Sequence, residues 1–173
     1  MAGEHAVAAA PGFQRLSRVL AAAAAGGARV IEGRYTSDDA CFVTEVVETD
    51  AGHLQLTITA LGELAPGQLA SCRWAFVNAD GVSEVQRLVT PLSARPGRAA
   101  CARYDLGSVL PAEAVDVAPA GLVPLASLSP GDVRAAFARV LYGSARRAWV
   151  ALLERPDLPL PARSALLREL NRP

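Results

Sequence analysis

The chain has 173 residues, with 17 basic and 17 acidic side chains, and 51% of its residues are hydrophobic. A chain of this size fits one compact domain, or one domain with an appendage, and can build a core without a metal or a disulfide. The charged fraction of 20% excludes a disordered protein, and no run of about 18 apolar residues is present to span a membrane. Every basic residue is an arginine, which together with the abundant alanine indicates a GC-rich coding sequence.

Residues 1–27 are expected to form an N-terminal arm with a short helix. Phe13, Leu16 and Leu20 recur at intervals of three and four residues, which is the helical period. A secretory signal fits poorly, because Glu4 stands where such a signal is basic. The three cysteines leave at least one thiol unpaired in any intramolecular scheme. Together these features favour a cytoplasmic protein with free thiols.

Residues 28–127 are expected to form an antiparallel β-domain, because short apolar segments alternate with turn residues at spacings of about ten. In residues 53–61, apolar and polar side chains alternate as in a half-buried strand, and residues 41–48 form the natural hairpin partner through the turn at 49–52. The other expected strands are 72–77, 82–92, 98–106 and two short, proline-limited edge strands at 114–117 and 122–125.

Residues 128–173 are expected to form two or three helices that pack on the sheet or on a partner. Ser129 is a favourable N-cap and Pro130 suits the first helical turn. One helix reaching residue 154 would carry two apolar stripes; alternatively, Gly143 and Ser144 divide it into two helices. A last helix is expected from Pro161. The fold class is therefore α+β, an antiparallel β-sandwich or partly open barrel of about six to eight short strands with flanking helices.

The sequence offers little catalytic equipment. Only two histidines are present, and a Cys–His pair would have to join His53 to Cys41 or Cys72. The three cysteines and His53 lack the paired spacing of a zinc site, and phosphate-binding and hydrolase motifs are absent. We therefore predict no catalytic, cofactor-binding or metal-binding residues, and favour a non-enzymatic role.

The neutral total charge hides a division along the chain. Residues 28–127 hold seven arginines against twelve acidic residues, a net charge of −5, whereas residues 128–173 hold eight arginines against four, a net charge of +4. Docking of basic helices on an acidic sheet is the simplest explanation. Nucleic-acid binding is an alternative function of the tail arginines. Those considered are Arg139, Arg146, Arg147, Arg155, Arg163, Arg168 and Arg172.

The leading hypothesis is a protein-protein interaction or assembly module, whose β scaffold presents the C-terminal helices to a protein partner or a second copy. Aromatic and arginine side chains are enriched at interface hot spots. The expected interaction residues are Tyr142, Arg146, Trp149, Leu153, Leu167 and Leu170. An alternative is a small-molecule pocket bounded by Trp74, Phe76 and the face that carries Thr57 and Thr59.

Overall fold

The computed structural model describes residues 14–15, 18–20, 29–37, 41–49, 51–65, 68–77, 83–108 and 115–173. The strands are β1 (Gln14–Arg15), β2 (Arg18–Leu20), β3 (Arg29–Thr36), β4 (Phe42–Glu48), β5 (His53–Ala60), β6 (Gln68–Val77), β7 (Ser83–Thr90), β8 (Ser93–Arg95), β9 (Arg98–Ser108), β10 (Val115–Pro124) and β11 (Val140–Leu141). The helices are a 3-10 turn at Leu125–Ser127, α1 (Pro130–Phe137), α2 (Gly143–Leu152) and α3 (Leu160–Leu170).

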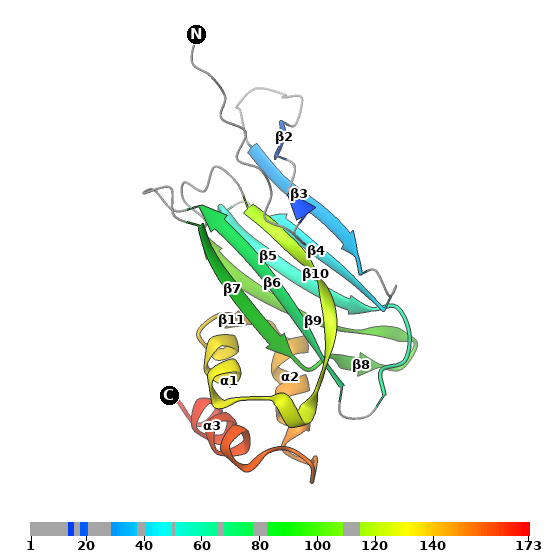
Figure 1. Ribbon diagram of the computed structural model, residues 1–173, viewed down its shortest axis with the longest axis vertical. Helices are drawn as coiled ribbons and strands as arrows, with labels where there is room; N and C mark the ends of the chain where they lie inside the picture. Colours follow the sequence, from blue (N-terminus) through cyan, green and yellow to red (C-terminus); the bar gives the residue numbers. More distant parts are fainter. Residues whose placement is uncertain are drawn as a thin grey trace.

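The strands form two antiparallel sheets that face each other, with the helices at one end of the molecule (Figure 1). One sheet has the order β1-β10-β6-β7, and the other has the order β11-β9-β5-β4-β3-β2, with β8 also paired to β9. The expected α+β class with antiparallel pairing is confirmed. The structure has more strands than expected. The additional ones include β1, β2, β8 and β11, which are only two or three residues long and were not predicted.

The expected hairpins are present. Strands β4 and β5 pair from Phe42 opposite Ala60 to Glu48 opposite Leu54, and Gly52 supplies the positive φ of 74° that their turn requires. Strands β6 and β7 pair along their length. Gly97, with φ of 69°, turns β8 into β9. Buried and partly exposed residues alternate strictly along β5, so one face of this strand lies in the core.

One expectation about the arm is not supported, and one about the strands is wrong. The N-terminal helix is not supported, because Gln14–Arg15 pairs with β10 and Arg18–Leu20 pairs with β3. Residues 1–13, 16–17 and 21–28 lie outside the described residues. Strand pairing satisfies backbone groups that a very short helix leaves open. The two expected edge strands form one strand, β10, which lies between β1 and β6. Its register shifts between Ala118 and Gly121, and this irregularity accommodates the internal proline.

The C-terminal segment forms separate helices, as the second alternative proposed. Ser129 and Asp132 form a reciprocal capping box at the start of α1. Residues 138–142 then leave the helical conformation and include the short strand β11. Helix α2 begins at Gly143, but its N-cap is Tyr142 and not Ser144. Helix α3 begins at Leu160, one residue before the expected proline.

The helices cover the edge of the sandwich that is formed by β7 in one sheet and by β9 with its short partners β8 and β11 in the other. Helix α1 packs on β7, α2 packs on β8 and β9, and α3 packs on α1. Buried residues from both sheets and all three helices form one continuous apolar cluster. The largest fully buried side chains are Trp149, Tyr104, Phe42, Leu54, Leu56, Ile58, Leu69, Leu88, Leu166, Val46 and Val89.

Candidate functional site

A groove of about 790 Å³ opens between α2 and the strand ends beside it. One wall is the flank of α2 that carries Arg147, Ala148, Ala151 and Leu152, with Arg155 just beyond the helix. The rest of the lining comes from residues 60–65, 68–69, 91–94 and 98–100. The groove therefore combines the helical layer with segments of both sheets.

The surface of the groove is largely apolar. Leu61 is 53% exposed in it, whereas Leu64 and Leu92 are partly buried and pack against the core. On the helical wall, Ala148 and Ala151 have short side chains that leave space above the floor. A leucine exposed at the edge of a concave apolar surface offers an aliphatic contact to a bound group.

The charged residues of the groove are three arginines and one glutamate. Arg155 is neutralised by Asp157, to which its guanidinium donates two hydrogen bonds of 2.9 and 2.7 Å. The side chains of Arg98 and Arg147 are exposed and make no hydrogen bond or ion pair with any described residue. Glu63 is likewise exposed. The groove thus has a positive balance, with two arginines that are available to a ligand.

Helix α2 is held in place by Trp149, whose side chain is fully buried. Its indole Nε1–H donates a hydrogen bond of 2.7 Å to the Tyr104 hydroxyl on β9, and its ring meets that of Phe137 edge to face at 5.7 Å. At the far end of the helix, Arg163 on α3 donates hydrogen bonds to the carbonyls of Leu153 and Arg155. The helical wall is therefore fixed at its middle and at its C-terminal end.

The six expected interaction residues do not form one surface. Trp149 is buried in the core and is not part of any surface that a partner reaches. Leu153 and Leu170 are partly buried and pack against the core, and Tyr142 is partly buried beside Arg103, whose guanidinium lies 6.0 Å from its ring centre. Arg146 on α2 and Leu167 on α3 are exposed. None of the six lines the groove.

The groove residues Leu61 and Arg98 were not predicted from the sequence, because they come from segments far from α2 in the chain. No local pattern marks Leu61 as exposed, because it directly follows a regularly alternating strand. Arg147 was noted only as one of the tail arginines. The common signal, a basic pair across an apolar surface, exists only after the strands and helices meet.

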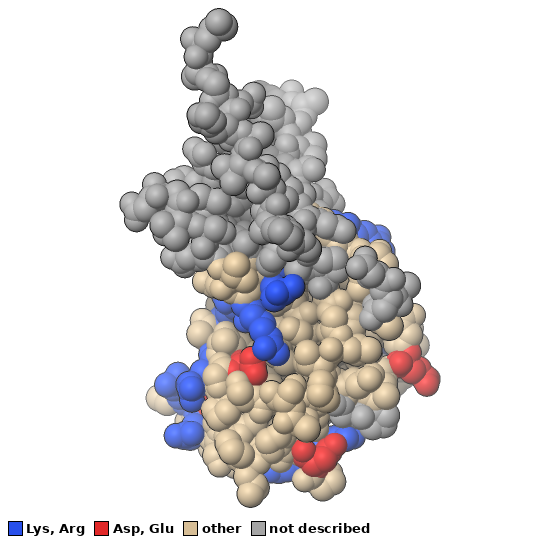
Figure 2. Space-filling view, viewed as in Figure 1, with Lys and Arg blue, Asp and Glu red and all other residues tan. Residues whose placement is uncertain are grey.

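Four of the seven tail arginines are engaged within the protein, which leaves fewer of them for the basic surface that nucleic-acid binding would use. Arg139 is partly buried, with its guanidinium 4.5 Å from the Trp74 ring centre and bonded to Gln86 on β7. Arg163 caps α2, and Arg155 and Arg172 are paired with acidic side chains. On the face shown in Figure 2, arginines accordingly occupy separate patches. The docking of basic helices on an acidic sheet would need arginine–carboxylate pairs. Among the described residues, the tail arginine that hydrogen-bonds to the sheet is Arg139, and its acceptor, Gln86, is a neutral amide.

A histidine–aspartate pair lies on the outer face of the larger sheet. His53 Nδ1 and Asp105 Oδ2 are 2.8 Å apart, and the Gly107 amide donates to the other carboxylate oxygen at 2.6 Å. Desolvation opposes ionisation of Asp105, but these hydrogen bonds outweigh it and lower the pKa of its carboxyl below the ordinary value. The β5–β9 register places Ser108 opposite His53, but the side chain of Ser108 lies outside the described residues. We interpret the pair as a link between β5 and β9.

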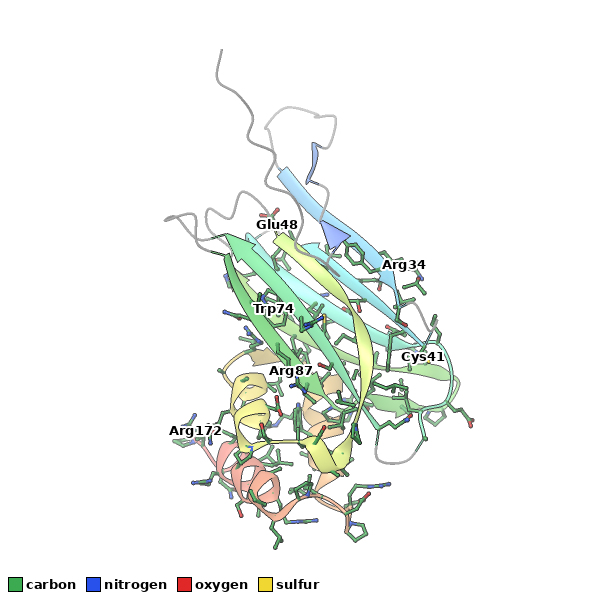
Figure 3. All side chains as sticks on the ribbon, viewed as in Figure 1. Arg34, Cys41, Glu48, Trp74, Arg87 and Arg172 are labelled. Carbon is green, nitrogen blue, oxygen red and sulfur yellow. The ribbon has the colours of Figure 1, made fainter. Side chains whose placement is uncertain are left out.

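A Cys–His pair is not formed. The β4–β5 register places His53 next to the turn and Cys41 at the opposite end of the hairpin, about 26 Å away at the rise of an extended strand. Figure 3 shows Cys41 and Glu48, which precedes the turn, at opposite ends of β4. Cys72 is fully buried, and this burial raises the pKa of its thiol to about 12, so it stays a neutral thiol.

The expected small-molecule pocket is not formed by its expected residues. Trp74 is buried in the core cluster to which both sheets contribute. Thr57 and Thr59 alternate with the buried residues of β5 and lie on the opposite, outer face of the other sheet. The side chain of Phe76 lies outside the described residues. Trp74 and the two threonines therefore cannot line one cavity.

No protein-family model, curated protein or solved structure matches this chain. Among the described residues, no helix has both the length and the apolar character needed to cross a membrane. The described residues also contain no cluster of three histidine, cysteine or acidic side chains with the geometry to hold a metal ion.

Proposed function

We propose that this chain is a non-enzymatic protein-interaction module whose binding surface is the groove beside α2. The observation that carries this proposal is the pair of exposed arginines, Arg98 and Arg147, across an apolar groove that contains the half-exposed Leu61. Apolar grooves with a polar rim are the usual form of a peptide-binding surface. In this proposal the helices serve mainly as the rigid wall of the site.

The scattered apolar residues on the outside of the helical layer support this choice over the outer helix surface. Val150 of α2 is 46% exposed, and Leu160 and Leu167 of α3 are 76% and 44% exposed, but the exposed Ser164 lies between the two leucines. Single exposed apolar side chains are normal on protein surfaces. The groove, in contrast, places apolar and cationic groups together.

The proposal is tested by selecting linear twelve-residue peptides from a random displayed library on the wild-type protein. Each enriched peptide is then measured by fluorescence anisotropy on A151W, which fills the groove from its exposed wall, and on S164W, which adds the same side chain at an exposed position of α3. We expect A151W to weaken binding at least about tenfold, a change typical of a blocked interface core, and S164W to have little effect. Binders that ignore A151W, or a selection without binders, would overturn the proposal.

A further inference from the structure

We infer that the groove takes an acidic segment of a different protein, in which at least one aliphatic side chain accompanies the carboxylates. This inference rests on the function proposed above. The groove has an excess of cations, since Arg155 is already neutralised by Asp157 while Arg98 and Arg147 have no partner among the described residues. Arginine binds carboxylates through two parallel hydrogen bonds, so each of the two offers a defined docking point.

The two arginines stand on different walls of the groove. Arg147 lies on α2, and Arg98 is the first residue of β9. Leu61, also in the lining, is 53% exposed and offers an aliphatic contact. A segment that carries carboxylates and an aliphatic side chain satisfies all three groups.

The length of the helical wall sets the size of the segment. Arg147 and Ala151 lie on α2 and Arg155 lies in the turn that follows it, so at about 1.5 Å per residue the wall is about 12 Å long. An extended chain covers this length with about four residues. A short acidic motif within a longer partner is therefore sufficient.

Among the carboxylates whose side chains the structure describes, most are engaged within the chain, which disfavours a second copy as the occupant. Partners within the chain are present for Glu45, Asp105, Asp132, Asp157 and Glu169. The helical end that carries the groove has a net charge of +4 over residues 128–173. Face-to-face pairing of two such ends would bring like charges together.

The inference is tested with the groove-dependent peptides from the selection described above. We expect acidic and aliphatic residues to be enriched together within about four positions. Replacing the Asp and Glu of a peptide by Asn and Gln should weaken its binding to the wild type about fivefold or more, consistent with two ion pairs, and the loss should shrink in R98Q/R147Q. R134E, a charge reversal at an exposed arginine of α1 outside the groove, should change affinity less than about twofold.

Reversing the charge of both groove arginines gives the most decisive test. The variant R98E/R147E should lose the acidic peptides and, in a new selection, enrich basic ones. Groove-dependent peptides without acidic preference, or an equal effect of R134E, would overturn the inference and leave the proposed function standing. Sedimentation equilibrium of the wild type should show a monomer. A dimer that A151W dissociates would identify a second copy as the occupant and would also overturn the inference.

Discussion

At the scale of single residues, the centre of the molecule is a chain of buried hydrogen bonds. Trp149 Nε1–H donates to the Tyr104 hydroxyl, which lies 2.6 Å from the Thr90 hydroxyl, and Thr90 donates to the Pro91 carbonyl at 2.9 Å. Because the Thr90 proton goes to Pro91, Tyr104 donates to Thr90. The indole N–H and both hydroxyls in this series of hydrogen bonds have partners, and the series joins α2 to β9 and β7.

Replacing Tyr104 by Phe should destabilise the protein by about 1–3 kcal/mol, because the buried indole N–H of Trp149 would lose its acceptor. The free energy of unfolding from urea titration measures this change. Y142F is the matched control: its hydroxyl has no partner among the described residues, so we expect a change within about 0.5 kcal/mol. Equal stability of Y104F and the wild type would contradict the role of the buried chain.

The same tyrosine predicts a pH dependence. Burial raises the pKa of Tyr104 to about 12, whereas an unfolded tyrosine titrates near 10. The unfolded state therefore loses its proton first, and this contribution to stability is complete below about pH 10 and falls as the pH rises toward 12. The fall in urea midpoint between pH 9 and 11.5 should be smaller in Y104F than in the wild type.

At the scale of elements, the break between α1 and α2 shows where local pattern is insufficient. Residues 130–154 are compatible with one long helix by periodicity alone. In the structure, Val140 and Leu141 pair with Asp105 and Tyr104 of β9, and the Tyr142 amide donates to the Arg103 carbonyl. The sheet edge thus supplies the backbone partners that a continuous helix would have provided within itself.

Arg163 is expected to stabilise the C-terminal end of α2 from outside that helix. In R163M, the carbonyls of Leu153 and Arg155 lose their donors while the aliphatic stem is kept, and we expect a loss of about 1–2 kcal/mol. Amide hydrogen exchange should be faster in the last turn of α2. R168M is the control, because Arg168 is exposed and bonds only to a carbonyl of its own helix among the described residues. Equal exchange in the two variants would argue against this role.

At the scale of the whole molecule, the helical end and the sandwich share one core. Trp149 and Leu166 of the helices belong to the same buried cluster as Phe42 and Ile58 of the sheet. Helices that only touched the outside of a sandwich would not contribute fully buried aromatic side chains to its core.

We therefore expect the protein to unfold in one cooperative transition. Urea curves followed by far-ultraviolet circular dichroism and by tryptophan fluorescence should coincide, because Trp74 lies between the sheets and Trp149 lies in the helical layer. A chain that ends at residue 127 should be aggregation-prone, because β7 and β9 would lose their apolar cover. Two separated transitions would contradict the shared core.

The sequence by itself determined the elements whose signals are local. Alternation along the strand that begins at residue 53, the turn expected at 49–52 with its glycine, and the Ser129 cap each act over a few residues, and the structure shows the alternation, the positive φ of Gly52 and the cap. The fate of the arm and of residues 138–142 depended on which sheet edge was available to pair with them. Those edges are created by strands distant in sequence, so no window of the chain contains the information.

The candidate site was decided by tertiary structure. The sequence marked Trp149 as an interface residue because large aromatic groups are enriched there, but the structure uses the same apolar area and N–H donor to fix α2 on β9. The arginines, which are alike in the sequence, have different surroundings in the structure. Arg139 and Arg163 form hydrogen bonds within the protein, whereas Arg98 and Arg147 lie beside an apolar groove. Charge along a chain is additive, whereas its presentation on a surface depends on which side chains folding brings together.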